Sequence, residues 1–189
     1  GILMDRADGH PMSAAIDLAR PEPVARALAK LHASLHACRA PQLPPQHEDL
    51  ARRIDAAQGL TSAQKRGALA RLDDLPRGDA LCHGDFHLDN VILTASGPVV
   101  IDWLDATRGD PLCDVARSVI LIQHAHHHEA EPRRQEAVRA VAQRFAHVYL
   151  THYADTTGAD VEIVARWIQT NAAARMSEGI LVEQEALAA

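Results

Sequence analysis

A short β-hairpin set between helical stretches is the feature of this sequence that most constrains its fold. Segment 91–102 reads VILTASGPVVID, in which the apolar runs Val91–Leu93 and Val99–Ile101 flank a turn that contains glycine and proline. A hairpin brings the start of its first strand beside the end of its second strand. Asn90 and Asp102 hold those two places, so we expect their side chains to lie close together.

The rest of the chain is dominated by helical patterns. Alanine, the best helix former, is abundant, whereas aromatic residues make up only 3% of the 189 residues. We therefore expect one domain that is mainly α with a small β-hairpin. Apolar spacing, capping residues and prolines predict an edge strand at 2–4 and helices over 13–19, 22–38, 50–58, 61–72, from 111 onward, over 132–153 and over 160–187.

Composition excludes several classes of function. The formal net charge of −6 argues against a nucleic-acid partner, which would normally be met by a basic patch. The sequence contains no apolar run long enough to span a membrane and no signal-peptide pattern, so we expect a cytoplasmic protein with no membrane partner. Cys38, Cys82 and Cys113 have no paired spacing and are expected to be reduced thiols.

Polar residues gather on both sides of the hairpin. The tripeptide from His83 to Asp85 precedes it, Asn90 follows Asp85 by five residues, and Asp102 ends the second strand. An amide oxygen beside a carboxylate is a pair of hard ligands that suits Mg²⁺, which takes its other ligands from phosphates and water. Asp85, across the loop, would remain able to accept a proton from an attacking hydroxyl. This order of groups matches the template for phosphoryl transfer.

Three motifs extend that match. HGDFHLDN, the strand end IDW and the downstream GDPLCDVA resemble, in this order, motifs of the aminoglycoside phosphotransferase and choline kinase family, which has a kinase-like fold. The resemblance implies a small-molecule phosphotransferase that moves the γ-phosphoryl group of ATP, or of GTP, to a hydroxyl. It implies that Asp85 is the catalytic base, that Asn90 and Asp102 bind Mg²⁺, and that His83 and Asp114 support the loop.

The first residues, ILMDRADG, resemble the hinge strand of this family. The resemblance implies that the backbone of Met4, Asp5, Arg6 and Ala7 meets the adenine ring. The expected organisation is a hinge strand and connector over 1–10, followed by a helical C-terminal lobe over 11–189 with the catalytic loop and hairpin at 81–103.

The nucleotide clamp of the family has no counterpart in this sequence. No glycine-rich strand pair precedes the hinge, and the only lysines, Lys30 and Lys65, lie in predicted helices. We therefore expect the C-terminal (large) lobe of a protein-kinase-like fold with the N-terminal lobe absent, through truncation rather than natural reduction. The isolated chain is expected to be inactive.

The acceptor is predicted only as a class. Acidic or aromatic groups in the C-terminal region bind aminoglycosides and choline in the family, which makes Asp105 and Glu178 candidate contacts for a cationic or sugar-like hydroxyl acceptor. Glu183 and Glu185 lie in the same region, and a solvated helix face explains any single glutamate equally well. The sequence predicts neither the acceptor's identity nor the oligomeric state.

Two alternatives remain open. His83, Asp85 and His87 form an H-x-D-x-H pattern that could serve a metal-dependent hydrolase using Zn²⁺ or Fe²⁺, although this leaves Asn90, the hairpin and Asp102 unexplained. The second alternative is a catalytically inactive kinase-like lobe that binds a ligand or partner.

Histidines elsewhere in the sequence have two explanations each. His32 and His36, spaced i and i+4, could hold a metal ion, although one packed and one exposed side chain is the commoner arrangement. The cluster at positions 124 and 126–128 could also bind a metal, but a solvated helix end explains it more simply.

Overall fold

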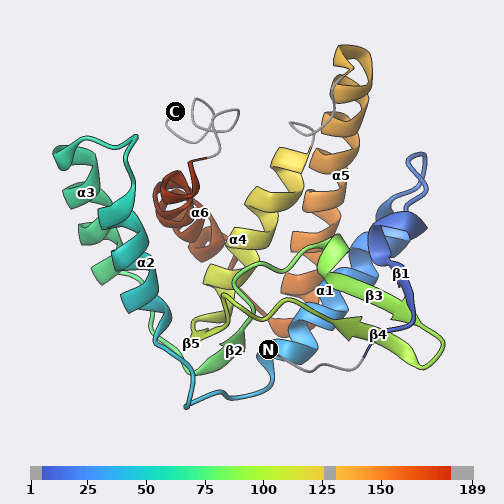
Figure 1. The fold of residues 1–189 in the computed structure, drawn as a ribbon, viewed down its shortest axis with the longest axis horizontal. Coiled ribbons are helices and arrows are strands. Elements are labelled where there is room, and N and C mark those ends of the chain that lie inside the picture. The colour runs from blue at the N-terminus through green and yellow to red at the C-terminus, as the bar shows by residue number, and fades with distance from the viewer. Residues whose placement is uncertain (1–5, 126–130, 180–189) are drawn as a thin grey trace.

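The computed structural model describes residues 6–125 and 131–179 (Figure 1). Helices make up most of the molecule, and two small antiparallel sheets lie along its lower edge in Figure 1. The helices are α1 (Glu22–His36), α2 (Gln46–Ala56), α3 (Ser62–Asp73), α4 (Pro111–His124), α5 (Pro132–Thr157) and α6 (Val161–Arg175), with short 3₁₀ segments at Met12–Ala15, Leu88–Asn90 and Met176–Glu178. The strands are β1 (Gly9–Pro11), β2 (Ala80–Cys82), β3 (Val91–Thr94), β4 (Gly97–Val100) and β5 (Thr107–Gly109).

The predicted hairpin is confirmed as β3 and β4. The strands pair antiparallel with Val91 opposite Val100 and Thr94 opposite Gly97, so Ala95 and Ser96 form a two-residue turn. The second strand therefore begins inside the segment that the sequence assigned to the turn. Gly97 has a φ of 121°, a backbone conformation that glycine adopts without steric cost.

The strand on the other edge of β3 is β1, which pairs antiparallel with it and gives the sheet order β1-β3-β4. The edge strand predicted at 2–4 falls outside the described residues. The β2-β5 pair was not predicted, because neither three-residue strand carries a readable pattern. Its position matters for the site, since β2 leads directly into the loop that starts at His83 and β5 leads into α4.

Most predicted helices are present with shifted ends. The capping box of α3 is confirmed, with the Thr61 hydroxyl and the Gln64 side chain each bonding the other residue's backbone N–H. Helix α5 runs to Thr157 and ends at Gly158, whose φ is 73°. The predictions over 13–19 and 160–187 were too long. A 3₁₀ turn occupies Met12–Ala15, α6 ends at Arg175, and the last ten positions lie outside the described residues.

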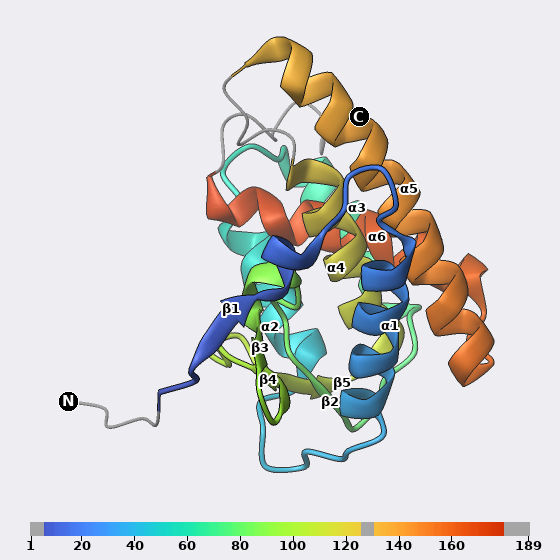
Figure 2. The ribbon, with the colours of Figure 1, turned by 90° about the vertical axis from the view of Figure 1, so that its right-hand side faces the viewer.

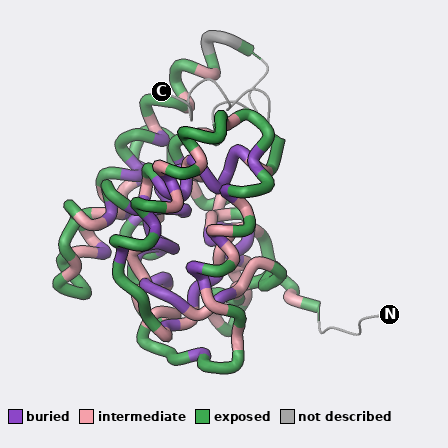
Figure 3. Tube along the Cα trace, turned by 90° about the vertical axis from the view of Figure 1, so that its left-hand side faces the viewer, coloured by how far each residue is buried: buried purple, intermediate pink, exposed green. Residues whose placement is uncertain are grey.

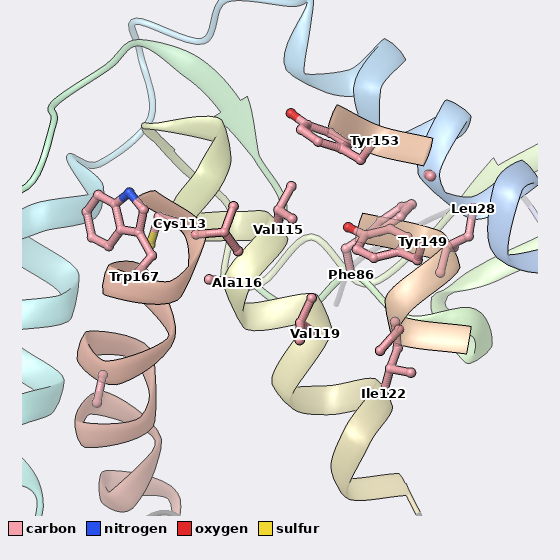
Figure 4. Close-up of a cluster of buried hydrophobic side chains, with 14 of the residues drawn as sticks. Leu28, Phe86, Cys113, Val115, Ala116, Val119, Ile122, Tyr149, Tyr153 and Trp167 are labelled. Atoms are coloured by element: carbon pink, nitrogen blue, oxygen red, sulfur yellow. The ribbon is translucent and has the colours of Figure 1, made fainter. Parts of the chain in front are cut away.

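The core lies around α4, the central helix. Nine residues of α4 are buried, which include both its apolar face and the polar Asp114, Arg117 and Ser118. Helix α1 packs along α5, and α4 contacts both α5 and α6 (Figure 2). The buried positions follow this interior while the outer turns are exposed (Figure 3). Figure 4 shows the apolar side chains that fill it, labelled Leu28, Phe86, Cys113, Val115, Ala116, Val119, Ile122, Tyr149, Tyr153 and Trp167.

In the part of the chain that the structure describes, no helix is both long enough and apolar enough to cross a bilayer.

Candidate active site

His83 anchors the loop between β2 and β3 through hydrogen bonds of its imidazole ring. Its Nδ1 accepts a hydrogen bond from the Asp85 N–H at 3.2 Å, so its Nε2 carries the proton and donates to the Ile101 carbonyl at 2.9 Å. The imidazole is fully buried and lies 4.7 Å from the Trp103 ring, centroid to centroid. His83 therefore ties the start of the loop to Ile101, the residue that follows β4.

Gly84 gives the loop its sharp bend. Its φ is 82°, and a Cβ at this position would collide with the carbonyl oxygen of Asp105. Only glycine combines this backbone conformation with such a close approach. The bend is followed directly by Asp85, which is half-buried.

Asp85 and Asn90 meet across the loop. The Asn90 amide donates from Nδ2 to the Asp85 carbonyl at 2.9 Å and to Asp85 Oδ2 at 3.3 Å. His87 Nε2 lies 3.4 Å from Oδ2, and an Arg117 guanidinium nitrogen lies 3.5 Å from Oδ1. Partial burial raises the pKa of Asp85, but the hydrogen bond and charge of His87 and the charge of Arg117 outweigh it and bring this pKa below its usual value. Asp85 is therefore ionised at neutral pH.

The hairpin places Asn90 opposite Ile101, the residue before Asp102. The Ile101 N–H donates to the Asn90 carbonyl at 3.0 Å, and Asp102 follows with a φ of 62°, the left-handed conformation that aspartate tolerates. Within the described ranges, neither the exposed Asp102 carboxylate nor the Asn90 amide oxygen has a hydrogen-bond or ion-pair partner. An unpaired carboxylate and an unpaired amide oxygen are a donor set that fits Mg²⁺.

Asp114, at the start of α4, holds the same loop from the inside. Its carboxylate accepts from the His83 N–H at 2.5 Å and from the Gly84 N–H at 2.8 Å. His32 Nε2 and His36 Nε2 approach Oδ2 at 3.1 and 3.3 Å. Burial raises the pKa of Asp114, but the hydrogen bonds from the two histidines reverse this and hold the pKa well below its usual value.

Two tyrosines complete this buried network. Nδ1 of His32 lies 2.6 Å from the Tyr149 hydroxyl, and Nδ1 of His36 lies 2.7 Å from the Tyr153 hydroxyl. The His32 ring also stacks on Phe86, with centroids 4.0 Å apart. Burial, together with the nearby His36, lowers the pKa of His32 to about 3, so His32 is neutral at physiological pH.

The histidine pair differs from the expected arrangement of one packed and one exposed side chain. Both side chains are buried, with 0% and 3% exposure. The ligand atoms of His32, His36 and Asp114 lie within 4.8 Å of one another, a spacing that could hold a metal ion. Hydrogen bonds already account for all four ring nitrogens and both carboxylate oxygens, so the cluster is satisfied as a network that supports the loop.

Asp85 also lines an open pocket of about 430 Å³. Asp105 and Glu178, the two candidate contacts for the acceptor, lie in the wall of this pocket. Glu178 pairs with Arg117 at 2.8 Å and with Arg175 at 2.9 Å. Arg53 reaches Asp105 at 2.7 Å and Glu178 at 3.6 Å. The lining residues are Arg52, Arg53, Asp85, Asp105, Arg117, Ser177 and Glu178.

Sequence reasoning did not find the arginines or tyrosines of the site. Arg53 and Arg117 lie on helices far from the loop in sequence, and nothing in their local pattern separates them from surface arginines. Tyr149 and Tyr153 have the same i, i+4 spacing as the two histidines that they contact, which is a signal only once α1 and α5 are known to pack together.

The hydrolase alternative is not favoured by this geometry. Both ring nitrogens of His83 are engaged by the protein's own backbone, so His83 is not free to join Asp85 and His87 as a metal ligand.

Of the proposed hinge residues, Met4 and Asp5 fall outside the described part. Arg6 and Ala7 lie in an irregular segment, where Arg6 forms an exposed ion pair with Asp8. Residues His126–His128, Glu183 and Glu185 also fall outside the described part.

One comparison with known protein families gives a match over most of the chain. The sequence model of the phosphotransferase enzyme family matches residues 2–158. A search of curated protein sequences returned no match.

Solved structures of similar fold include an aminoglycoside-3'-phosphotransferase of type VIII, with 23% identity, a TM-score of 0.58 and coverage of 88% of this chain and 67% of that one. A glucosamine kinase aligns with 16% identity and a TM-score of 0.59, over 94% of this chain and 55% of its own. A Plasmodium vivax ethanolamine kinase aligns with 14% identity and a TM-score of 0.58, over 96% and 58%. The chain thus has a kinase-like fold and spans a little over half to two thirds of the length of these structures.

Proposed function

Since the chain belongs to the phosphotransferase enzyme family, we propose that it is the helical C-terminal lobe of an enzyme that transfers the γ-phosphoryl group of ATP or GTP to a hydroxyl of a small molecule. The observation that supports this proposal is the hydrogen bond from Asn90 to Asp85, formed beside a hairpin in which Ile101, the residue before Asp102, bonds the Asn90 carbonyl. In this proposal Asp85 is the base, and Asn90 and Asp102 supply two hard oxygen ligands for a metal ion.

Asp85 acts on the acceptor. Its carboxylate is ionised at neutral pH and borders the open pocket, so it can accept the proton of a hydroxyl bound there. Asn90 and Arg117 hold the carboxylate from two sides and restrict its rotation. A fixed base orients the hydroxyl oxygen for attack on phosphorus, and positioning is a large part of catalysis in this class of reaction.

Asn90 and Asp102 are proposed to hold Mg²⁺. The ion, when bound, would neutralise charge on the nucleotide phosphates during transfer. The contribution of this chain is to keep the two oxygens available: the amide nitrogen of Asn90 is turned toward Asp85, which leaves its oxygen free, and the left-handed backbone of Asp102 keeps its carboxylate exposed. The backbone at 4–7 is proposed to meet the nucleotide base.

The decisive variant is Asp85→Asn. It keeps the shape of the side chain and removes the charge that accepts the proton, so phosphoryl transfer should fall by about 10²–10⁴-fold. The measurement is transfer of labelled γ-phosphate from Mg²⁺-ATP to a panel of hydroxyl acceptors, using the protein that carries this chain. Circular dichroism before and after unfolding shows whether the variant is folded.

Asp89→Asn is the matched control. Asp89 is in the same loop but is exposed, and its carboxylate contacts Ser13 rather than the pocket. This variant should transfer phosphate at close to the wild-type rate. Wild-type turnover in Asp85→Asn would show that Asp85 is not the base. An unaltered protein that binds ligands but transfers phosphate to no acceptor would instead support the inactive binding lobe.

A further inference from the structure

The pocket that Asp85 borders contains as many arginines as carboxylates. Arg52, Arg53 and Arg117 line it together with Asp85, Asp105 and Glu178. Three positive and three negative side chains leave its wall without net charge, although the chain as a whole carries a formal charge of −6. An acidic protein has thus concentrated arginines where the acceptor is proposed to bind.

Glu178 is the carboxylate most completely neutralised. Arg117 and Arg175 contact it at 2.8 and 2.9 Å, and a third arginine, Arg53, lies 3.6 Å away. The side chains of Arg117 and Arg175 are only 8% and 5% exposed, so these pairs are shielded from water and held in place. An incoming ammonium group would have to compete with two buried guanidinium groups for the same carboxylate.

Asp105 and Asp85 are engaged in the same way. Arg53 donates to Asp105 at 2.7 Å while its Nε is bonded to Asp49 at 2.6 Å, so its position is fixed by α2. Asp85 faces Arg117 and His87. Each carboxylate of the pocket therefore has a basic partner from the protein, and a cationic ligand would lose its hydration without gaining an unpaired counter-ion.

We infer that the acceptor of this enzyme is an uncharged hydroxyl compound, sugar- or polyol-like, and that the arginine–carboxylate pairs of the pocket select against its amine-bearing analogues. The inference rests on the proposed function, because it takes the Asp85 pocket to be the acceptor site. It narrows the cationic or sugar-like class indicated by the sequence to its neutral members. Arg53 and Arg117 are the specificity-determining residues.

Matched pairs of ligands test the inference directly. Glucose is compared with glucosamine, and ethylene glycol with ethanolamine, at a slightly acidic pH where both amines are protonated. Binding to the full 189-residue chain is measured by ligand-observed NMR titration in Mg²⁺ buffer. The neutral member of a pair should bind about tenfold more tightly than the amine, because the amine meets neighbouring guanidinium charges.

Removing a positive or a negative charge from the pocket should have different effects on the ratio of the affinities for the neutral ligand and the amine. Arg53→Gln removes one positive charge and leaves Asp105 and Glu178 less compensated, so the preference for the neutral member should fall about tenfold and vanish. Asp105→Asn should leave the preference intact or increase it. Arg39→Gln is the control, because Arg39 is an exposed arginine whose partner is Asp79, outside the pocket. A merely structural role for Arg53 would weaken both members of a pair equally and leave their ratio unchanged.

The outcomes separate this inference from the proposed function. Tighter binding of the amines, an unchanged ratio in Arg53→Gln, or no binding of either member of both pairs would overturn the inference. Phosphoryl transfer to an amine-bearing acceptor in preference to its neutral analogue would overturn it while leaving the phosphotransferase proposal intact. Selective binding of neutral ligands without any transfer would support the inference and defeat the phosphotransferase proposal.

Discussion

Asp114 is the residue through which the buried core determines the shape of the loop between β2 and β3. Its two oxygens receive backbone N–H groups from the residues just before Asp85, and two histidines backed by tyrosines approach one of those oxygens. A buried carboxylate is tolerated only when such donors compensate for the loss of water. The sequence identified Asp114 as a supporting residue by resemblance, but not the groups that make its burial possible.

Acid should destabilise the protein through His32. The pKa of His32 is about 3 in the folded state and about 6.5 in the unfolded chain, so between these values the unfolded state binds more protons. Stability should fall by up to about 1.4 kcal/mol for each pH unit below about 6. The depressed pKa of Asp114 adds a loss only at lower pH, beginning near about 4, the ordinary aspartate value. Urea unfolding at a series of pH values measures this slope.

His32→Gln identifies the source of that slope. Glutamine keeps hydrogen-bonding capacity and does not titrate, so the variant should lose most of the dependence between about pH 6 and pH 4 even if its stability at neutral pH is lower. Burial also lowers the pKa of His47, which should keep a smaller part of the slope. His10→Gln, an exposed histidine in β1, should keep the wild-type slope. Equal slopes in His32→Gln and the unaltered protein would mean that His32 is not the group responsible.

At the scale of elements, the site depends on one hairpin and one loop. Local residues determine the hairpin, whereas contacts with distant segments determine the loop. The hairpin was readable because its strands are adjacent in sequence and its turn residues are local signals. The loop was readable only as a motif. Its shape comes from β2 pairing with β5, from Asp114 on α4 and from Asp105 beyond the hairpin, which are contacts between distant segments. Local patterns carry no information about such pairings.

Gly84→Ala should disrupt the loop without removing any polar group. The substitution forces alanine into a φ of 82° and places a Cβ against the Asp105 carbonyl, which should cost more than about 2 kcal/mol of stability. Urea unfolding gives the energy, and amide chemical shifts of residues 83–90 show whether the loop has moved.

Gly67→Ala is the comparison for this substitution. Gly67 lies inside α3, and its added Cβ would meet only the Arg71 side chain at 3.7 Å, an ordinary contact. Alanine is the better helix former, so this variant should be more stable by about 0.5–1 kcal/mol. A Gly84→Ala protein as stable as the unaltered one, with an unshifted loop, would contradict the role given to the bend.

At the scale of the whole molecule, α4 joins the candidate active site to the core. Its first turn carries Asp114 and its second carries Arg117, while its remaining faces pack against α5 and α6. The sequence predicted a single helical unit with a hairpin between its helices. The resemblance pointed to Glu178 as a candidate acceptor contact, but the sequence did not predict that Arg117 would pair with it, since that depends on how the helices pack.

Because the proposed metal ligands, Asn90 and Asp102, flank a folded hairpin, Mg²⁺ binding there should stabilise the molecule as a whole. A ligand that binds only the native state adds about 2.7 kcal/mol at one hundred times its dissociation constant. For a chain of this size the melting temperature should then rise by roughly 5–10 °C. Asp102→Asn should abolish the rise without lowering the melting temperature in metal-free buffer. Asparagine also tolerates the left-handed backbone, and the Asp102 carboxylate has no partner among the described residues.

Thermal melts at constant ionic strength measure the effect, with Asp89→Asn as a charge-matched control that should keep the full rise. A rise of equal size in Asp102→Asn would place the ion elsewhere in the protein and remove Asp102 from the proposed metal site.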